Sequence, residues 1–402
     1  MVSRQPFAFA RAAARFSSIM IFYFDFAMYL RMVRLSLKET NPKGRRRLLI
    51  TLFFVIPILS GFTAICFFLD KILFPGLWKI EVRQPVFMVG HARSGTTLLH
   101  RILARDVDRF SYFMLYELFF PSLLQKKIIR GIASLDTRFG SPIGRRIRAW
   151  EERSFGKTND LHRMGLTLAE EDDFIFTLSC ASGYWIVLLP YMGRLDFYHV
   201  DERPERSRRR LMEFYGECVK RQLYLNGPGK QHLSKNPTFC GRVGSIIETF
   251  PDSRIVYLAR NPEETIPSLL KLMQTTWAMR GWTEDDMRAS LQTLAYQSYE
   301  SYTAPLEVLE RNPQTKHAIV DYRELVKAPR ETVTQVYREL GFPISPAFEE
   351  MLLEEEKRSG RHETTHRYSL DEFGLDAGEI QAELAPLFDR FEWPRSPIAK
   401  TR

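Results

Sequence analysis

The segment Pro85–Leu99 constrains the fold more than any other part of the chain. It places a short apolar strand pattern, Val86–Val89, before a loop bounded by Gly90 and Gly95 and a helical pattern that opens on Thr96. Backbone N–H groups in such a loop, together with the positive end of the following helix, form a binding site for a phosphate group. The two glycines allow the backbone to approach that group closely. The segment therefore predicts an α/β domain that binds a phosphate ester.

Further strand patterns follow along the chain, and each leads into a turn and then a helical pattern. They comprise Gln231–Ser234, Arg254–Leu258 and Ala318–Val320. Short apolar strands that alternate with longer helices are typical of a parallel sheet covered by helices. With 402 residues, of which 45% are hydrophobic, the chain has ample material for a core and is not mainly disordered. We predict a P-loop-type, three-layer α/β/α fold with a central parallel sheet, preceded by an N-terminal hydrophobic helix.

The predicted loop differs from the phosphate loop of ATP-dependent enzymes. Such a loop carries a lysine directly after its second glycine. Here that position is Thr96, and the cation of the loop is Arg93. A later strand pattern leads to Arg260 rather than to an aspartate suited to Mg²⁺. We therefore expect a phosphate ester held by arginine and hydroxyl groups without a metal. A P-loop kinase or NTPase is the alternative, and a metal requirement for turnover would favour it.

A second anion site is predicted where the strand pattern 254–258 ends. Asn261 can cap the next helix, and Pro262 suits the first position of that helix. Arg260 lies at the strand end and Ser268 about two turns into the helix. Because arginine offers a planar fork of donors and serine a hydroxyl group, the two side chains can bind one anion.

Together the two sites resemble the signature of sulfotransferases that use 3′-phosphoadenosine 5′-phosphosulfate (PAPS), in particular the bacterial-type branch with an Arg-Ser-Gly-Thr-Thr loop. The resemblance covers residues 85 to about 375. It implies that the loop binds the 5′-phosphosulfate, that an arginine and a serine eight positions later bind the 3′-phosphate, and that a tyrosine lies near the adenine. The residues at these positions are Arg93, Ser94, Gly95, Thr96 and Thr97 in the loop, Arg260 and Ser268 at the second site, and Tyr322 at the adenine.

Other segments share this resemblance, and some positions depart from it. Soluble cytosolic members have Pro-Lys-Ser-Gly-Thr-Thr-Trp where this chain has Ala92-Arg93 and Leu98. Their glycine-rich C-terminal motif is matched only loosely by residues 357–362. The segments that resemble the family are 233–237 (its Lys-x-Pro turn), 321–329 (the part before its late helix) and 368–375 (the C-terminal part of the bacterial-type branch).

Sulfonate transfer needs an acceptor in line with the leaving phosphate, a base for the acceptor's proton, and donors for the charge that develops. The resemblance implies that Arg93 and the turn 94–97 hold the leaving side, and that Lys235 bridges to the transferring group. Glu117 is the predicted base. It follows the loop helix amid apolar residues, and such surroundings raise the pKa of a carboxylate.

A second acidic candidate is the run Glu170–Asp173, within which Glu171 is a further candidate catalytic residue. The run resembles an acidic element of the same branch. Successive carboxylates are also typical of a solvated helix start, and we expect the run to be exposed. Histidines that could replace either base are His100, His162 and His362.

The N-terminal part of the chain has a different character. Leu48–Leu69 contains 22 residues without a charge, long enough for the ~30 Å hydrocarbon core of a bilayer. It starts too late for a cleaved signal peptide. A buried core helix is the alternative, because Pro57 and Gly61 weaken a simple spanning helix. We divide the chain into a basic amphipathic arm (1–47), a membrane-inserted helix (48–72) and a sulfotransferase domain (73–402).

The basic charge of the chain lies in the arm. Residues 1–47 carry +8 of the net charge of +9, so the body is nearly neutral and a nucleic-acid partner is not indicated. The pattern 16–37 predicts either an interfacial amphipathic helix drawn to anionic lipid or a helix that covers the body.

The orientation of the body relative to the membrane is predicted from two opposing signals. The basic cluster 43–47 before the apolar run favours a cytoplasmic N-terminus, with the body on the far side. A kinked, re-entrant or monotopic segment at Pro57 keeps the body on the cytoplasmic side instead. The four cysteines are widely spaced and form neither a disulfide framework nor a metal motif. We therefore expect a cytoplasmic catalytic domain.

The leading prediction is a membrane-associated sulfotransferase that transfers a sulfonate group from PAPS to a hydroxyl or an amine. About 16 residues, at most ~55 Å of extended chain, separate Leu69 from Val86, which favours a lipid or other amphipathic acceptor. A soluble small molecule is the alternative acceptor. A catalytically silent nucleotide-binding membrane protein is a further alternative. The sequence leaves open the identity of the acceptor and whether the chain forms a homo-oligomer.

Overall fold

The computed structural model describes residues 22–155, 165–359 and 370–396. Its strands are β1 (Val86–Val89), β2 (Phe110–Ser111), β3 (Gln231–Lys235), β4 (Arg254–Ala259) and β5 (His317–Asp321). In the described residues these form a five-stranded sheet in the order β2-β3-β1-β4-β5, and each pair of neighbours is parallel. The predicted central parallel sheet is confirmed. The short edge strand β2 is an addition to the four strands that the sequence predicts.

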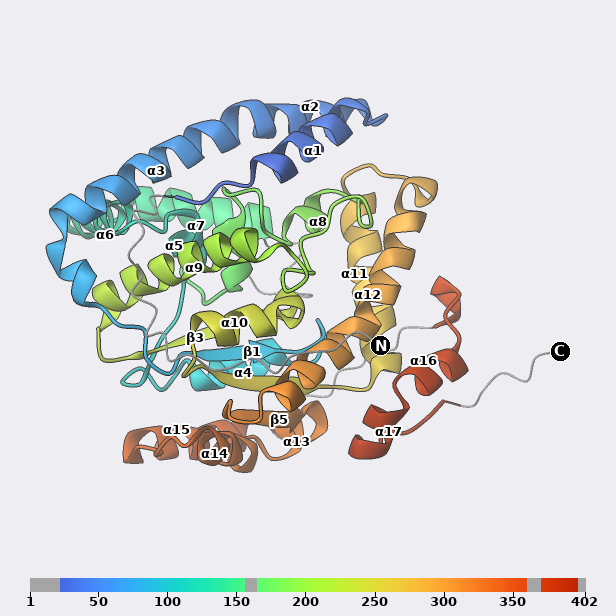
Figure 1. Ribbon diagram of the computed structural model, residues 1–402. Helices are drawn as coiled ribbons and strands as arrows, with labels where there is room; N and C mark the ends of the chain where they lie inside the picture. The colour runs from blue at the N-terminus through green and yellow to red at the C-terminus, as the bar shows by residue number, and fades with distance from the viewer. Residues whose placement is uncertain (1–21, 156–164, 360–369, 397–402) are drawn as a thin grey trace.

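Helices lie on both sides of this sheet (Figure 1). The first part of the chain forms α1 (Phe26–Leu37), α2 (Pro42–Ile50), the π-helical turn η1 (Thr51–Val55), α3 (Ile56–Leu73), η2 (Pro75–Lys79), α4 (Thr96–Leu103), α5 (Leu115–Phe119), α6 (Leu123–Arg138) and α7 (Pro142–Phe155). The middle part forms η3 (Asp172–Phe176), α8 (Trp185–Leu188), α9 (Glu205–Asn226), η4 (Pro237–Arg242), α10 (Val243–Thr249), α11 (Pro262–Ala278) and α12 (Glu284–Arg311). The last part forms α13 (Tyr322–Lys327), α14 (Pro329–Leu340), α15 (Pro346–Ser359), η5 (Asp371–Phe373), α16 (Ala377–Glu383) and α17 (Ala385–Phe391).

The central strands are buried on both faces, so their side chains alternate between two apolar cores. In β1, Val86 and Met88 pack with residues of α4, α13, α14 and α15. Phe87 and Val89 face the opposite way, into a larger core shared with α9, α10, α11 and α12. Strands covered on both faces are apolar along their whole length, which is why β1 and β4 are clear in the sequence. The predicted three-layer α/β/α fold is confirmed.

The N-terminal hydrophobic segment is one long helix. Gly44–Leu73 is the one helix of the described residues that is long and apolar enough to cross a membrane. It does not break at Pro57, because the turn before the proline, η1, is π-helical and the N–H of Ile56 donates to the carbonyl of Thr51. The wider turn accommodates the proline ring without ending the helix. Only 33% of the most apolar stretch of this helix is buried, so it is not an ordinary core helix.

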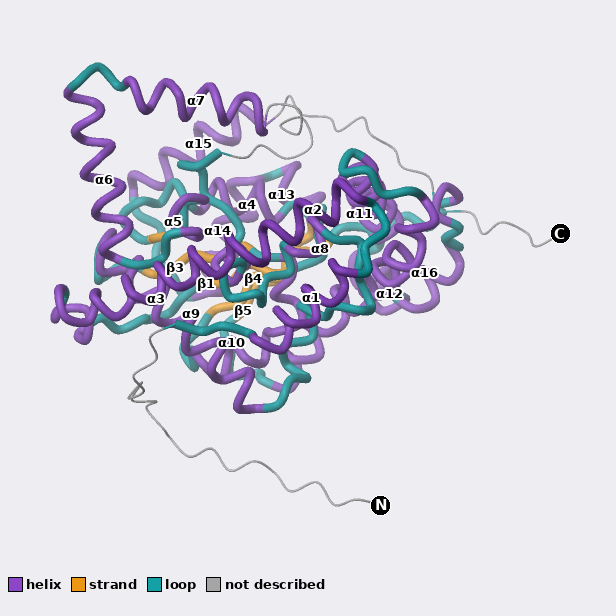
Figure 2. The backbone as a smooth tube through the Cα atoms, turned by 90° about the horizontal axis from the view of Figure 1, so that it is seen from above, coloured by secondary structure: helices purple, strands orange, loops and turns teal. Residues whose placement is uncertain are grey.

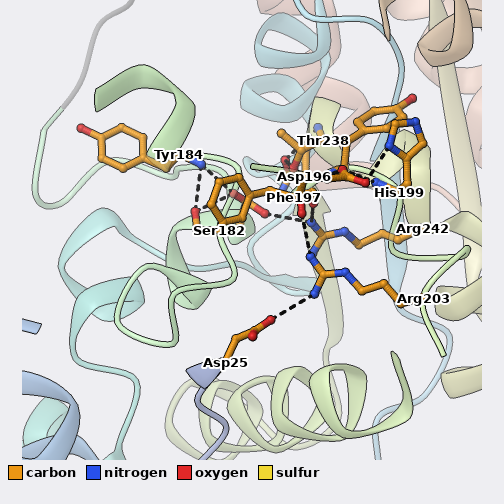
Figure 3. Close-up of polar contacts among 12 residues, drawn as sticks. Asp25, Ser182, Tyr184, Asp196, Phe197, His199, Arg203, Thr238 and Arg242 are labelled. Atoms are coloured by element: carbon orange, nitrogen blue, oxygen red, sulfur yellow. Dashed lines mark hydrogen bonds and ion pairs between the residues drawn. The ribbon is translucent and has the colours of Figure 1, made fainter. Parts of the chain in front are cut away.

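The segment before this helix is fixed to the body by polar contacts (Figure 3). The Asp25 side chain accepts a hydrogen bond from the N–H of Met28 at the start of α1 and lies 3.6 Å from the guanidinium of Arg203. One face of α1 is buried against the body, whereas Phe26 and Leu30 on another face are exposed. Helix α1 therefore covers the body, as one of the two alternatives predicted, and still presents apolar side chains outward.

Candidate active site

The phosphate loop begins at Gly90, directly after β1. Gly90 has φ +145°, and a Cβ atom at this position would lie 2.2 Å from the carbonyl oxygen of Leu258 in β4. The N–H of Gly90 donates to the Sγ of Cys240, over 3.2 Å. The loop therefore leaves the sheet pressed against the neighbouring strand, and only glycine allows so close an approach.

The loop ends at Gly95, which is the N-cap residue of α4 and has φ +93°. A Cβ atom here would lie 2.3 Å from the ring of Tyr322, the first residue of α13. The bare glycine thus lets the tyrosine ring pack directly on the loop. The hydroxyl of Ser94, next to Gly95, is buried and makes no hydrogen bond within the described residues. A buried hydroxyl without a partner, beside a helix N-terminus, fits a site for an anionic group.

Arg93 links the loop to the second predicted site. Its backbone has φ +73°, in the left-handed region, and its Nε donates to the hydroxyl of Ser268 over 3.2 Å. Arg260 donates to the carbonyl oxygen of Arg93 over 3.4 Å, and its guanidinium lies 4.4 Å from the centre of the Tyr322 ring. Arg260 also pairs with the exposed Glu264, at 2.7 Å. The structure therefore brings together the arginines, the serine, the tyrosine and the loop that the sequence assigns to the nucleotide.

The start of α11 has the local structure that its sequence predicts. Asn261 caps the helix by accepting from the N–H of Glu263, over 2.9 Å, and Pro262 is the first helical residue. This cap places Arg260 at the end of β4 and Ser268 two turns into α11, both beside the phosphate loop.

Lys235 lies at the end of β3, next to β1. Its backbone is in register with Met88, and the following N–H, of Asn236, donates to the carbonyl of Met88. The Lys235 side chain is 1% exposed, and its Nζ lies 3.2 Å from Oε1 of Glu171, which is 28% exposed. The structure thus joins two of the predicted catalytic residues in an ion pair at the sheet edge from which the phosphate loop emerges.

His100 is close to this ion pair. It lies on α4 and is fully buried, and its Nε2 atom has no hydrogen-bond partner among the described residues. Burial, together with the nearby positive charge of Lys235, lowers the pKa of His100 to about 3. The imidazole is therefore neutral at physiological pH. The other two candidate histidines, His162 and His362, lie outside the described residues.

The acidic run 170–173 is not exposed, contrary to our expectation. Asp172 accepts from the Tyr215 hydroxyl over 2.5 Å and from His232 over 2.7 Å. Asp173 is also buried, and it accepts hydrogen bonds from the hydroxyl of Ser182, at 2.6 Å, from the N–H of Tyr184, at 3.1 Å, and from the guanidinium of Arg242, at 3.1 Å. These three donors are labelled in Figure 3. Buried carboxylates need such partners, and Tyr215, His232 and Arg242 come from distant parts of the chain. Within the run, Glu171 is the member whose carboxylate reaches both solvent and Lys235.

Glu117 is fully buried, but its surroundings are polar rather than apolar as predicted. Its carboxylate accepts hydrogen bonds from the N–H of Met114, the amide of Gln222, the hydroxyl of Tyr116 and the guanidinium of Arg130, over 2.7–3.2 Å. Both carboxylate oxygens are therefore engaged. These hydrogen bonds connect α5 to α6 and α9. The sequence pattern around Glu117 does not predict them, because a donor such as Gln222 lies 105 positions away.

The described residues contain no group of three or more His, Cys, Asp or Glu side chains that could hold a metal ion. The groups placed around the phosphate loop are instead arginines, hydroxyls and backbone N–H groups. Such donors suit an anion with several phosphate oxygens.

Comparison with solved structures shows which proteins share this fold. A sulfotransferase from Mycobacterium avium, STF9, superimposes with a TM-score of 0.68 at 18% identity, over 92% of this chain and 93% of that chain. The sulfotransferase STF1 from Mycobacterium tuberculosis H37Rv gives a TM-score of 0.62, also at 18% identity, over 92% of this chain and 94% of that chain. At this level of identity, the likeness establishes the fold.

Comparison of sequences gives further relatives. The chain is 26% identical over 266 residues to Stf3 of Mycobacterium tuberculosis and of Mycobacterium bovis, an omega-hydroxy-beta-dihydromenaquinone-9 sulfotransferase. The match covers 64% of this chain and 62% of the relative, so it spans less than two thirds of the relative's length. A family model described as the sulfotransferase family matches residues 85–346, from the strand before the phosphate loop to the start of α15. The chain belongs to the sulfotransferase family.

Proposed function

We propose that the protein transfers a sulfonate group from PAPS to a hydroxyl or an amine of a lipid or other amphipathic acceptor, at a membrane surface. The observation that carries the proposal is the convergence of Arg93, Ser268 and Arg260 around one loop. Two anion sites in contact with each other fit a nucleotide with phosphate groups on both its 3′ and 5′ sides. An ATP-type site has no need of the second anion site.

The two anion sites would hold the two phosphate-bearing ends of PAPS. Arg93 and the backbone of the turn 94–97 would hold the 5′-phosphosulfate, and the buried Ser94 hydroxyl would gain a partner there. Arg260 and Ser268 would hold the 3′-phosphate, and Tyr322 would lie against the adenine. PAPS, when bound, supplies the sulfonate and a phosphate leaving group. The positive groups lower the free energy of transfer because they stabilise the charge that develops on the leaving oxygen.

We assign the proton transfer to Glu171 in preference to Glu117. Glu171 is partly exposed, and its carboxylate pairs with Lys235, which lies at the end of β3 beside the loop. The carboxylate of Glu117 is already saturated by four donors, so an acceptor hydroxyl would have to displace one of them. In this assignment Lys235 orients Glu171 and stabilises charge on the transferring group, while Glu171 accepts the acceptor's proton.

The proposal of a lipid acceptor rests on the helix 44–73 and on the relative Stf3, whose name gives a menaquinone derivative as its substrate. An acceptor with a polar hydroxyl end and a long apolar part would be held in the bilayer with its reactive end at the surface. Since PAPS is made in the bacterial cytoplasm, we place the catalytic domain on the cytoplasmic side.

Sulfonate transfer can be tested with detergent-purified protein, PAPS carrying ³⁵S, and lipid extract. We expect label to enter the lipid fraction, also in the presence of EDTA, and to be lost in Arg93→Ala. Arg311→Ala is the control, because Arg311 is an exposed arginine at the end of α12. Tight binding of 3′,5′-ADP without transfer to any acceptor would favour the silent nucleotide-binding protein. A strict Mg²⁺ requirement with ATP as donor would favour the kinase.

A further inference from the structure

The outward face of the long helix 44–73 is apolar from Ile50 to Leu73. The helix lies along one side of the body and does not project from it (Figure 1). Its exposed side chains include Phe54, Ile58, Phe62, Ile65 and Ile72. Trp78, which follows the helix in η2, is exposed as well. A continuous apolar face of this length is unfavourable in water and matches the hydrocarbon of a bilayer.

The inward face of the same helix is partly polar, and its polar groups are bonded to the body. The hydroxyl of Ser60 donates to the carbonyl of Leu178 over 2.7 Å. The amide of Gln125, at the start of α6, donates to the hydroxyl of Thr63 over 3.1 Å. A helix that spans a bilayer alone meets lipid on every face, whereas here one face is built to meet protein.

Asp70 is the strongest of these attachments. Its carboxylate is fully buried and lies 2.8 Å from Nε of Arg221, which is fully buried too. It also accepts from the hydroxyl of Ser122 and from the N–H groups of Leu123 and Leu124, over 2.8–2.9 Å, at the start of α6. If α3 left the body to span the bilayer, Asp70 would enter the lipid or its headgroups, and Arg221 would stay buried without this partner. Both changes are unfavourable.

The hairpin of α6 and α7 is a second apolar element beside α3. It stands out from the rest of the molecule (Figure 2), and α6 begins at the Asp70 carboxylate. The turn between its helices is closed by Asp136, which accepts from the N–H groups of Ile143 and Gly144. Both helices expose apolar side chains three and four positions apart, which is one stripe on a helix. These side chains are Ile128, Ile132 and Leu135 in α6, and Ile143, Ile147 and Trp150 in α7.

The charge around these apolar faces is positive. Arg45, Arg46 and Arg47 are exposed at the start of the long helix. The hairpin adds exposed arginines at positions 138, 145, 146, 148 and 153. Its acidic residues are Asp136, which is turned inward as a cap, and Glu151 and Glu152 near the end of α7. Arginines that border an apolar stripe can bind lipid phosphate while the stripe enters the acyl region. This complementarity favours an anionic membrane over a second protein as the occupant of the surface.

We propose that the chain is monotopic: the outer face of helix 44–73 and the apolar stripes of the α6–α7 hairpin enter one leaflet, and both ends of the helix stay on the side of the body. The proposal rests on the membrane association put forward above and adds its geometry. It also removes the conflict between the basic cluster 43–47 and a cytoplasmic body, because the cluster and the body then lie on the same side.

The first test measures the contribution of the hairpin with full-length protein and preformed vesicles of phosphatidylcholine, with or without phosphatidylglycerol. Since each substitution removes one isoleucine from lipid, the double variant Ile132→Glu/Ile147→Glu should lower the partition coefficient in flotation by about tenfold or more. Tyr296→Glu, at a site on α12 that is 69% exposed, is the matched control and should float like the wild type. Unchanged flotation of the hairpin variant would overturn the role of the hairpin.

The second test determines sidedness with a membrane-impermeant maleimide on intact spheroplasts and inside-out vesicles. The native cysteines are all buried, so single cysteines introduced at exposed sites report alone. We expect Arg46→Cys, Lys79→Cys and the body control Glu310→Cys to react from the same side. Reaction of the first two from opposite sides would overturn the monotopic geometry while leaving membrane association intact. Wild-type protein that fails to float and forms a dimer would contradict membrane association itself and assign the surface to a second copy.

Discussion

The Nε atom of Arg93 donates to the hydroxyl of Ser268 over 3.2 Å, although the two residues are 175 positions apart in the chain. This contact joins the phosphate loop to helix α11. Because Arg260 donates to the backbone of Arg93 as well, the two anion sites form one continuous group of donors. A ligand that carries phosphates at two separate positions can use all of them at once.

We therefore expect 3′,5′-ADP to bind, and Arg260→Ala to weaken its binding by about 1.5–3 kcal/mol, as for a charge-assisted hydrogen bond. ADP without the 3′-phosphate should bind weakly and respond little to the same substitution. Isothermal titration calorimetry with both nucleotides gives the comparison. Equal losses of affinity for the two nucleotides would contradict the assignment of the 3′-phosphate to Arg260 and Ser268.

A second prediction concerns the contact between Gly95 and Tyr322. A Cβ atom on Gly95 would lie 2.3 Å from the tyrosine ring, in a backbone conformation with φ +93°. Gly95→Ala should therefore displace either the ring or the loop and abolish measurable binding of 3′,5′-ADP. Gly229→Ala is the control, because a Cβ atom there meets nothing within 4 Å. The double variant Gly95→Ala/Tyr322→Ala should recover part of the affinity, and a failure of either comparison would mean that the loop does not depend on this close approach.

Much of the fold and of the nucleotide site could be predicted because the information is local in the chain. Strands such as β1 and β4 are continuous apolar runs, and the loop glycines lie within six positions of each other. The cap at Asn261 and the hydroxyl of Ser268 are set by helical spacing alone. These features depend on neighbours in sequence, so pattern and spacing are enough to find them.

The parts that the sequence could not predict depend on distant partners. Asp173 is buried because Arg242, 69 positions away, reaches it, and an acidic run gives no sign of such a donor. The two-residue strand β2 pairs with β3 and is too short to show a pattern. The continuity of the helix through Pro57 depends on the π-helical turn before it, which has no sequence signature of its own.

A third prediction concerns the pH dependence of stability. The hydrogen bonds of His199 to Asp196, at 3.0 Å, and to Glu300, at 2.7 Å, raise the pKa of His199 from 6.5 to about 9 (Figure 3). The stabilisation by a histidine whose pKa is higher in the folded state is complete below pH 6.5 and is lost as the pH rises to about 9. Since solvent screens the exposed Asp196, we expect a loss of about 1–2 kcal/mol.

Chemical denaturation at several pH values measures this effect. The free energy of unfolding of the wild type should fall over this range, whereas that of His199→Gln should be lower at pH 6.5 and change less with pH. Parallel curves for the two proteins would show that His199 does not carry the pH dependence.

At lower pH, the ion pair depends on whether the Asp196 carboxylate stays ionised, and therefore on the pKa of Asp196. Burial alone would raise it, but the hydrogen bonds to His199 lower it to about 2, so that partner stays ionised in mildly acidic buffers.

The last prediction separates the two candidate bases. Glu171→Gln preserves shape but cannot accept a proton, so turnover should fall about 10²–10⁴-fold while binding of 3′,5′-ADP and thermal stability change little. Glu117→Gln should instead lower the free energy of unfolding by about 1–3 kcal/mol, because two of its donors, Arg130 and Gln222, lose a charged acceptor. Its turnover, measured well below its melting temperature, should stay near that of the wild type. Lys235→Met tests the partner residue of the same site: it should reduce turnover, because Glu171 loses the cation that orients its carboxylate. If Glu117→Gln abolishes turnover in a protein that remains folded, and Glu171→Gln does not, the two assignments must be exchanged.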